Sequence, residues 1–502
     1  MTTATQDRML ALSRHHYLHG RYVPGTGTHH AIHDPASLAC IGHYADATPD
    51  EVEMAVAHAQ AAQRAWWALS STERAQALHT VATRMEAIAA SVGECLTREM
   101  GKPYRESHWE AGASASAFRY YAELARHDQG RVAGPAVAGQ WHMTFKEPLG
   151  TVVSIVPYNF PALLFGWQAA AALAAGNAVI VKPSELTSLT LLLLMDAFAD
   201  LPNGLVQLLT GGAAVGAQLV AHANTHAVAF TGSVKAAQSV ARAAAERFKP
   251  VLTEASGNDP FIVMPSAPVE VVARGAAFAA FLNCGQVCTS AERFYVHEDV
   301  FEPFVAALTR HARALRLGHG LDKVDMGPLA NERELLRVEK VLARAVEQGA
   351  VVRCGNRRPP HLATGWFWEP TVLEVRHDMD IMHQELFGPI APVCKVTSLD
   401  EAIRYANDSE FGLGANLYTH QLHEAMRAVA EIESGIVWVN TPLNDNDCVP
   451  FGGRKMTGSG RELGTEGLEQ FRRSKMVMMA PEALDDDEWF PYPDGDAFRA
   501  GD

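Results

Sequence analysis

The sequence has few cysteines and no long apolar run, and these two shortages limit the class of protein. Its seven cysteines are scattered over 502 residues without paired CxxC motifs, so neither a disulfide framework nor a structural zinc site is indicated. No stretch approaches the roughly 18–20 apolar residues that span a bilayer, and the first residues lack the pattern of a secretory signal. We therefore expect a cytoplasmic protein that holds no metal and does not bind membranes.

Positive charge is also scarce. Lys and Arg number 42 against 57 Asp and Glu, which gives a formal net charge of −15, and no basic cluster stands out as a binding surface for nucleic acid. Hydrophobic residues make up 48% of the chain and charged residues only 20%, a composition that excludes a disordered protein. A chain of this length exceeds a single compact core, so we expect two or three globular domains.

Short apolar runs alternate with helical segments and predict a doubly wound α/β fold. The runs GTVVSIVP, NAVIVKP, LVQLLTG and AVAFTGS lack polar alternation, and each is followed by a helical segment. This pattern is typical of a parallel sheet that is covered on both faces. A second α/β region follows, up to about Thr441. The segment before Gly42 instead predicts an irregular arm with short strands.

Two cysteines lie in the glycine-containing turn FLNCGQVCTS. Cys284 and Cys288 are both candidates for a nucleophile, but a free cysteine is more often a small apolar residue that fills the core. The residues alone do not distinguish the two thiols. Glu254, in LTEASGNDP at the end of a predicted strand, is a candidate general base, with a solvated or ion-paired carboxylate as the alternative.

Polar residues at the ends of the predicted parallel strands are candidate ligand groups. Asn159 in PYNFP can donate to an oxyanion or simply form the turn. Lys182 and Glu185 in VKPSE can hold ribose hydroxyls, although Ser184 and Glu185 could equally cap a helix. The GxGxxG fingerprint is absent, but two glycine-containing turns could bring backbone amides to a pyrophosphate; they contain Gly211, Gly212, Gly216, Phe230, Thr231, Gly232 and Ser233.

Taken together, these motifs resemble the NAD(P)-dependent aldehyde dehydrogenases of the non-acylating type. The motifs PYNFP, KPSE, FTGS, TEASG, FLNCGQVC, ELFGP and PFGGRKMTGSGRELG occur in the order and spacing of that family over nearly the whole chain. The resemblance implies that Cys288 is the nucleophile, that Asn159 stabilises the oxyanion and that Glu254 activates the hydrolytic water. Cys284 becomes a filler, and Glu254 argues against a branch that passes the acyl group to coenzyme A.

The resemblance also implies a cofactor site and a substrate pocket. The cofactor is expected to be NAD rather than NADP, because the Glu185 carboxylate would repel a 2′-phosphate. The implied cofactor-binding residues are Pro157, Tyr158, Lys182, Glu185, Gly216, Phe230, Gly232, Ser233, Glu385 and Phe387. The implied substrate-pocket residues are Phe160, Leu163, Trp167, Asp445 and Phe451.

The sequence departs from the family pattern at three places. Tyr158 stands where the family usually has Trp, and EASGN replaces the usual ELGGK. Gln168 stands where a Lys often follows Trp167, which puts a Lys-assisted proton relay to Glu462 in doubt. In the loop TPLNDNDCV, Asp445 and Asp447 could attract a cationic aminoaldehyde, or they could form a solvated turn.

The resemblance implies three structural parts and an oligomer. Residues 1–129 and 150–257 would form the dinucleotide-binding domain, residues 258–455 the catalytic domain, and residues 130–149 with 470–502 a β element that bridges subunits of a homodimer or homotetramer. The expected reaction is NAD-dependent oxidation of a polar aldehyde to its acid. The alternatives are a semialdehyde dehydrogenase with an anionic substrate, a noncatalytic nucleotide-binding member, and a cofactor-free cysteine hydrolase.

Overall fold

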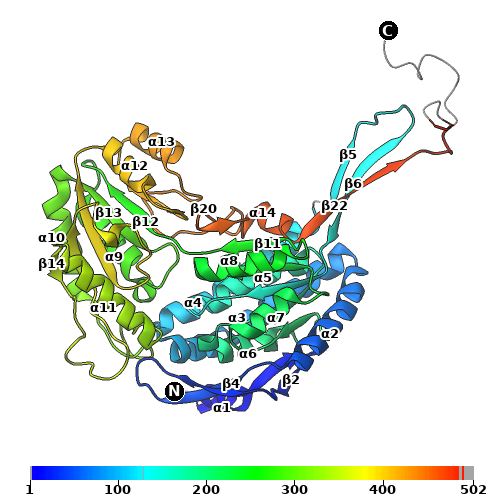
Figure 1. Cartoon of the computed structure of the whole chain (residues 1–502), viewed down its shortest axis with the longest axis horizontal. Helices are drawn as coiled ribbons and strands as arrows, with labels where there is room; N and C mark the ends of the chain where they lie inside the picture. The colour runs from blue at the N-terminus through cyan, green and yellow to red at the C-terminus, as the bar shows by residue number, and fades with distance from the viewer. Residues whose placement is uncertain (1–2, 128, 486–488, 491–502) are drawn as a thin grey trace, which may run out of the picture.

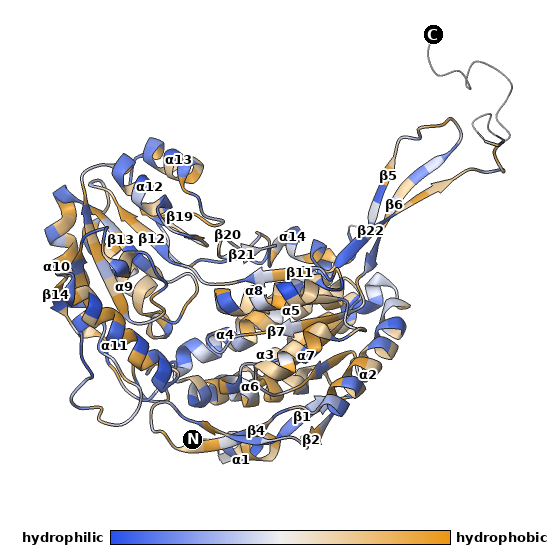
Figure 2. Ribbon diagram, viewed as in Figure 1, coloured by the Kyte–Doolittle hydropathy of each residue, from blue (hydrophilic) through white to orange (hydrophobic). Residues whose placement is uncertain are grey.

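A computed structural model describes residues 3–127, 129–485 and 489–490 as two α/β lobes and a projecting arm (Figure 1). Apolar residues concentrate on the central strands and on the helices packed against them, whereas the outer helices mix both kinds (Figure 2). Within these residues, none of the helices combines the length and the apolar character needed to cross a membrane. The doubly wound α/β prediction is confirmed.

The first lobe contains an eight-stranded sheet whose central strands are parallel. Its strands are, in order, β2 (Arg21–Pro24), β1 (His15–Leu18), β9 (Val206–Leu208), β8 (Ala178–Lys182), β7 (Thr151–Ile155), β10 (Ala227–Thr231), β11 (Val251–Glu254) and β21 (Gly458–Ser459). Every residue of β7, β8 and β10 is buried, which explains why these strands lack polar alternation. The carboxyl ends of β7, β8 and β10 lie side by side, so the residues that follow them share one edge of the sheet.

Helices cover both faces of this sheet. They are α2 (Pro49–Trp67), α3 (Ser71–Met100), α4 (Tyr104–Leu124), α5 (Pro161–Ala174), α6 (Ser188–Leu194), α7 (Ala213–Ala221) and α8 (Val234–Ala245), with the 3-10 turns η1 (Glu185–Thr187) and η2 (Met195–Phe198). Capping boxes begin α2 at Thr48 and α3 at Ser70. Each residue of α5 is buried, so this helix forms the centre of the lobe.

The N-terminal segment differs from its prediction. It begins with a helix, α1 (Thr3–Leu12), which precedes β1, β2 and a separate hairpin of β3 (His29–His33) and β4 (Cys40–Ala45). The helix has no acidic residue in its first turn and a weak apolar stripe. Burial of Met9 and Leu12 and the Arg8–Asp196 ion pair hold it, and such tertiary contacts cannot be read from local sequence.

The second lobe contains a seven-stranded sheet. Its order is β14 (Val351–Cys354), β15 (Thr371–Val375), β16 (Ile390–Val396), β13 (Ala291–His297), β12 (Asp259–Val263), β18 (Asn416–Tyr418) and β19 (Trp438–Val439). Its helices are α9 (Val269–Phe281), α10 (Phe301–Ala314), α11 (Glu332–Glu347), α12 (Leu399–Asn407) and α13 (Leu422–Glu431), with the 3-10 turns η3 (Leu282–Gly285), η4 (Glu298–Val300) and η5 (Asp380–Met382). Two short strands, β17 (Phe411–Gly412) and β20 (Arg454–Lys455), pair beside it.

The arm is a three-stranded antiparallel sheet that projects from the first lobe (Figure 1). The predicted hairpin forms β5 (Gly130–Ala133) and β6 (Trp141–Pro148), and after α14 (Gly464–Glu469) the chain returns as β22 (Arg472–Met479) to pair with β6. Val132, Trp141 and Met476 on the arm are exposed. Apolar residues of this kind suit a subunit interface, and both the oligomer and the domain boundaries stay predictions.

Candidate active site

The turn that carries both candidate thiols has an unusual backbone. Asn283, Cys284 and Gly285 have φ values of 51°, 58° and 72°, so three successive residues adopt the left-handed conformation after α9. Two of them are not glycine, and such strained conformations persist where surrounding contacts hold them, often at functional sites. Here the Asn283 amide donates to Glu106 at 3.0 Å, and the Asn283 side-chain amide donates to the Gln286 carbonyl at 3.2 Å.

The structure separates the two thiols. Cys284 is only 1% exposed and packs in the core of the second lobe, which matches its expected role as a filler. Cys288 is partly exposed and lines a cavity between the lobes. Burial raises the pKa of the Cys288 thiol well above its usual value, and nearby carboxylates, Asp259 and Glu254 first among them, raise it further. Both causes favour the neutral thiol over the thiolate.

Asn159 lies across the cavity wall from the Cys288 turn, after β7 and before α5. Its side-chain Nδ2 donates to the Gln286 carbonyl at 3.1 Å. An amide nitrogen carries two hydrogens, so a second N–H remains for a ligand. The Asn159 carbonyl accepts from Asn283 Nδ2 at 3.1 Å and from the Lys102 ammonium group. These bonds hold both the side chain and the backbone of Asn159 in place.

A buried ion pair supports Asn159 from behind. Lys102 Nζ lies 2.6 Å from Glu110, and both side chains are fully buried. Glu110 also accepts from the amides of Ala162 and Leu163, at 2.8 and 3.3 Å, where a carboxylate stabilises the free N–H groups that begin α5. Sequence reasoning missed Lys102 and Glu110, because no local pattern marks their contacts with Asn159 and Ala162, which lie 57 and 52 positions away in the chain.

Glu254 ends β11 and is buried rather than solvated, with an exposed fraction of 3%. Among the described residues, neither of its oxygens has a well-formed hydrogen bond; the charge of Arg461 and the nearby Gly453 amide favour the ionised form only weakly. Burial and the Glu462 carboxylate raise the pKa of Glu254 well above its usual value. A Cβ atom on Gly452 would come within 2.4 Å of Glu254 Oε1, so glycine is needed there to leave room for the carboxylate.

Gln168 joins the carboxylate region to the sheet. Its side chain accepts from Ser154 Oγ at 2.6 Å and donates to Thr231 Oγ1 at 3.0 Å and to Glu462 Oε1 at 2.9 Å. Burial raises the pKa of Glu462 to about 7. A neutral amide at position 168 thus stands where a lysine is often found, and it contacts Glu462. Glu254 and Glu462 therefore lie near each other with no lysine at position 168 to balance their charges.

A cavity of about 460 Å³ at the carboxyl ends of the parallel strands contains most of the predicted cofactor residues. Cys288 and Asn159 line it, but Glu254 lies outside its wall. The predicted cofactor residues on the wall are Pro157, Tyr158, Lys182, Glu185, Phe230, Gly232, Ser233, Glu385 and Phe387. Gly216 lies behind Lys182 instead, since a Cβ atom there would be 3.3 Å from Lys182 Cδ.

One end of the cavity fits the ribose of a nucleotide. Burial lowers the pKa of Lys182, whose Nζ donates to the Gly211 carbonyl at 2.8 Å. Asp46, which sequence reasoning missed, accepts from the Gly212 amide at 3.0 Å and lies in the same corner as Glu185. The first turn of α8 after Ser233 has no side-chain cap, which leaves amide N–H groups available to a phosphate.

The other end of the cavity is formed by Glu385 and Phe387. The buried Glu292 carboxylate accepts from the amides of Leu386 and Phe387, at 2.8 and 2.7 Å, and so fixes this loop. The Tyr158 ring meets the Phe387 ring edge to face at 6.1 Å. The residues present therefore fit a dinucleotide that extends from Lys182 to Phe387 and ends beside Cys288.

The predicted substrate residues lie elsewhere. Phe160, Leu163, Trp167 and Phe451 are buried, and the rings of Trp167 and Phe451 are 5.0 Å apart. None of these four residues lines the dinucleotide cavity. Asp445 lies in the loop before β20, where partial desolvation of its carboxylate by the surrounding chain and the charge of Asp447 raise its pKa to about 6. Its negative charge also raises the pKa of the Cys288 thiol.

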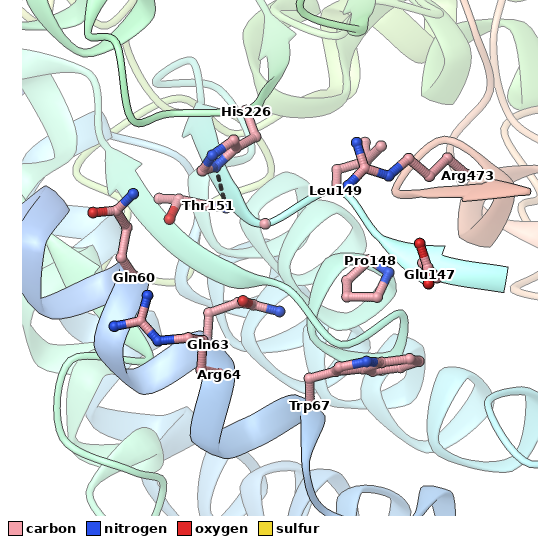
Figure 3. Close-up of a pocket in the computed structure, with 11 residues that line it drawn as sticks. Gln60, Gln63, Arg64, Trp67, Glu147, Pro148, Leu149, Thr151, His226 and Arg473 are labelled. Carbon is pink, nitrogen blue, oxygen red and sulfur yellow. Dashed lines mark hydrogen bonds between the residues drawn. The ribbon is translucent and has the colours of Figure 1, made fainter. Parts of the chain in front are cut away.

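A separate cavity of about 400 Å³ lies at the opposite edge of the first sheet, between α2 and the base of the arm (Figure 3). Arg64, Trp67, His226 and Arg473 surround it, and the His226 ring accepts from the Thr151 amide at 3.0 Å. It adjoins the beginnings of the strands and contains none of the predicted site residues. The chemistry therefore belongs to the other edge.

The chain is similar to known proteins over most of its length. The model of the aldehyde dehydrogenase family matches residues 22–477. Aminoaldehyde dehydrogenase 1 of Malus domestica is 35% identical over 92% of this chain and 94% of its own length, and 3-sulfolactaldehyde dehydrogenase of Pseudomonas putida is 34% identical over 93% and 97%.

Solved structures give the same result. A 3,6-anhydro-L-galactose dehydrogenase with bound NADP superposes with a TM-score of 0.90 at 36% identity, over 93% of this chain and all of that one. Betaine aldehyde dehydrogenase of Staphylococcus aureus with NAD⁺ gives a TM-score of 0.93 at 28% identity, over 98% and 99%.

Proposed function

The chain belongs to the aldehyde dehydrogenase family, and from that premise we propose that it oxidises an aldehyde to its carboxylic acid through a thioester on Cys288. One observation carries this proposal: Cys288 and Asn159, from different lobes, converge on the wall of a dinucleotide-sized cavity. Asn159 keeps one N–H free there. A nucleophile beside a pre-oriented donor is what addition to a carbonyl requires.

The chain's own groups supply the first step. The Cys288 thiol gives its proton to solvent water, the resulting thiolate attacks the aldehyde carbon, and the carbonyl oxygen becomes an oxyanion. The free N–H of Asn159, which is held in place before the reaction, stabilises this oxyanion. The nicotinamide dinucleotide, when bound, accepts the hydride that leaves the substrate carbon.

Glu254 supports the second step. The thioester is hydrolysed by a water molecule that loses its proton to the Glu254 carboxylate, and the acid product leaves as the Cys288 thiol re-forms. Because the pKa of Glu254 is raised, the ionised base is scarce at low pH and more abundant as the pH rises. Glu254 must reach the thioester from behind the cavity wall, and Gly452 leaves the carboxylate room to move.

Two carboxylates support a preference for NAD over NADP. Glu185 and Asp46 flank Gly212, with Oε1 and Oδ1 at 3.5 and 4.0 Å from the position of a Cβ atom there. A 2′-phosphate in this corner would meet both negative charges, whereas ribose hydroxyls can donate to a carboxylate. Lys182 is engaged with the Gly211 carbonyl and offsets only part of this charge.

The substrate proposal is a cationic aminoaldehyde. Asp445 acts on Cys288 from the loop 441–450, and the relatives include enzymes named for aminoaldehydes and betaine aldehyde. The relative named for 3-sulfolactaldehyde favours an anionic substrate as the second candidate. Changing Asp445 and Asp447 to Asn should lower kcat/KM for aminobutyraldehyde and leave it unchanged for a neutral aldehyde. An equal change in kcat/KM for aminobutyraldehyde and for the neutral aldehyde would show that the charges of Asp445 and Asp447 do not select a cationic substrate.

The reaction is tested by NADH absorbance with a panel of aldehydes, each with NAD and with NADP. Cys288→Ala should abolish NADH formation, while Cys284→Ala, a matched change in the same turn, should retain most of it. Glu185→Ser should raise kcat/KM with NADP relative to NAD. NADH formation that survives Cys288→Ala, or ester hydrolysis that needs no cofactor in a chain that binds neither dinucleotide, would overturn the proposal.

A further inference from the structure

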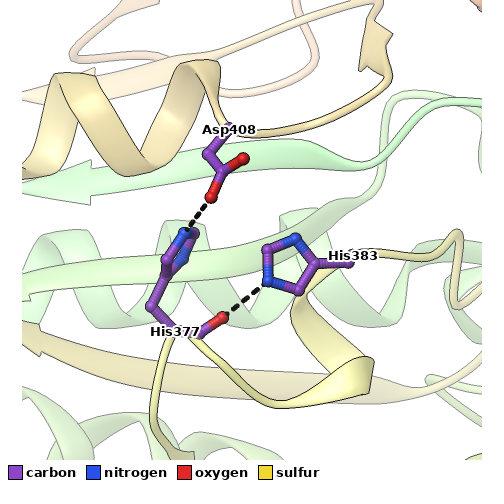
Figure 4. A group of neighbouring side chains, drawn as sticks. All are labelled: His377, His383 and Asp408. Atoms are coloured by element: carbon purple, nitrogen blue, oxygen red, sulfur yellow. Dashed lines mark hydrogen bonds and ion pairs between the residues drawn. The ribbon is translucent and has the colours of Figure 1, made fainter.

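Two histidines and an aspartate form a cluster on the second lobe that the proposed reaction does not use (Figure 4). His377 and His383 flank η5 in the loop after β15, and Asp408 follows α12. One ligand atom from each of the three side chains lies within 4.8 Å of the other two. We propose that this cluster binds a divalent transition metal ion such as Zn²⁺, and this inference does not depend on the proposed function.

His383 is oriented to be a ligand. Its Nε2 atom lies 2.8 Å from the backbone carbonyl of His377, and because a carbonyl only accepts, Nε2 carries the hydrogen. The other nitrogen, Nδ1, therefore holds the lone pair, and it lies on the ring edge away from the His377 carbonyl (Figure 4). Metal-binding histidines commonly donate their second ring nitrogen to a carbonyl in this way, which fixes the tautomer and the ring direction.

His377 is held even more firmly. Its ring stacks on Tyr405 with centroids 3.9 Å apart and an interplanar angle of 15°. Its Nδ1 atom lies 3.1 Å from the hydroxyl of the buried Tyr295, while Nε2 faces Asp408 Oδ2 at 2.9 Å. The inner nitrogen is thus used for positioning, and the outer nitrogen is directed at the centre of the cluster.

The separations are close to those of a metal site. Zinc binds nitrogen and carboxylate oxygen at about 2.0–2.2 Å, which places neighbouring ligand atoms of a tetrahedron about 3.3 Å apart. To bind an ion, His377 Nε2 and Asp408 Oδ2, now 2.9 Å apart, must separate slightly. The ligand atom of His383, which lies within 4.8 Å of the other two, must move closer to them. Both His383 and Asp408 are exposed, so small side-chain rotations suffice.

The set of ligands also indicates the class of metal. Two imidazoles and one carboxylate are the donor types of three-ligand zinc sites, whose fourth position holds water. Imidazole selects zinc, copper, nickel or iron over calcium and magnesium, which prefer oxygen ligands. A bound ion would tie the loop after β15 to the end of α12. One of its ligands, His383, lies only two residues before Glu385 on the cavity wall.

Calorimetric titration with Zn²⁺ tests the proposal, with Cys288→Ala as the parent chain so that the thiol in the cavity does not compete. His383→Ala and Asp408→Asn, made in this parent, should each weaken one binding event by at least about tenfold, because even changes behind the ligands cost about 10–100-fold in metal affinity. His423→Ala is the matched control: this exposed histidine lies on α13, outside the cluster, and its loss should leave the binding unchanged.

A Co²⁺ titration identifies the ligands by visible absorption. The proposal expects a spectrum of nitrogen and oxygen ligands in the parent and in His423→Ala, and its loss in His383→Ala and Asp408→Asn. Both changes are at exposed positions, so the variants should fold, as their circular dichroism would verify. Absence of binding at about 0.1 mM Zn²⁺, or equal binding by the parent and His383→Ala, would show that the cluster is only a hydrogen-bonded pair with a neighbouring histidine.

Discussion

The regions on either side of Cys288 are built in opposite ways. On the oxyanion side, Asn159 is held by Gln286, Asn283 and Lys102, and the charge of Lys102 is balanced by Glu110. On the base side, both oxygens of Glu254 lack a well-formed hydrogen bond among the described residues, and the neighbouring Glu462 carries the same charge.

This difference indicates how each region works. A donor held by several bonds needs no reorganisation when the oxyanion forms, which is the condition for strong electrostatic stabilisation. A buried carboxylate with few partners instead has a pKa that its neighbours control. We therefore expect changes on the oxyanion side to affect stability and the first step, and changes on the base side to affect hydrolysis and its pH dependence.

The largest expected effect is that of Glu254→Gln. Loss of a general base lowers rates by about 10²–10⁴-fold, and here only thioester hydrolysis should slow. Stopped-flow measurement should show one NADH formed per site in a rapid burst, followed by a very slow steady state. A burst that slows as much as the steady state would show that Glu254 acts before the thioester forms. That result would reject the assignment of Glu254 to hydrolysis alone.

Lys102→Met tests the oxyanion side through stability. Removing one partner of a buried ion pair leaves Glu110 uncompensated and costs about 3–5 kcal/mol of unfolding free energy. Lys475→Met, which removes the partner of Glu147 on the exposed arm, should cost at most about 1 kcal/mol. Urea denaturation measures both changes.

A double change guards against a variant that fails to fold. Lys102→Met with Glu110→Gln removes both charges but keeps an acceptor for the α5 amides, so it should recover part of the loss. Equal losses for Lys102→Met and Lys475→Met would show that the ion pair does not support the site.

Asn159→Ala should lower the rate of the NADH burst by about 10²–10³-fold, the usual cost of removing one oxyanion donor. The steady state should fall with it, because the first step becomes limiting. Asn159→Asp keeps the size but loses the N–H, so it should be impaired at least as much. An unaltered burst in either variant would remove Asn159 from the mechanism.

The smallest expected effect is a pH shift in Glu462→Gln. The base acts when ionised, so the steady-state rate falls as the pH drops through the raised pKa of Glu254. Removing the Glu462 charge lowers that pKa, and the acidic limb of the kcat profile should move to lower pH. Gln168→Lys, which adds a cation beside Glu462, should move it the same way. A shift to higher pH would contradict the assigned coupling.

Much of the fold followed from local sequence, and so did some of the residues that meet at the cavity. Glu385 and Phe387 followed only from the resemblance to the family. Apolar runs without polar alternation predicted β7, β8 and β10. The positions of Asn159 after β7 and of Lys182 at the end of β8 placed both residues at one edge of the sheet. The N-terminal helix was missed because packing, not propensity, stabilises it.

The sequence by itself determined the parallel strands, because each depends on residues that are neighbours in the chain, and its motifs singled out Cys288 through their resemblance to a family. Only the tertiary structure decided which charges are buried together, such as Lys102 with Glu110 and Glu254 beside Glu462. The physical reason is that the ionisation of a buried group depends on distance and desolvation, and these arise only when distant segments pack.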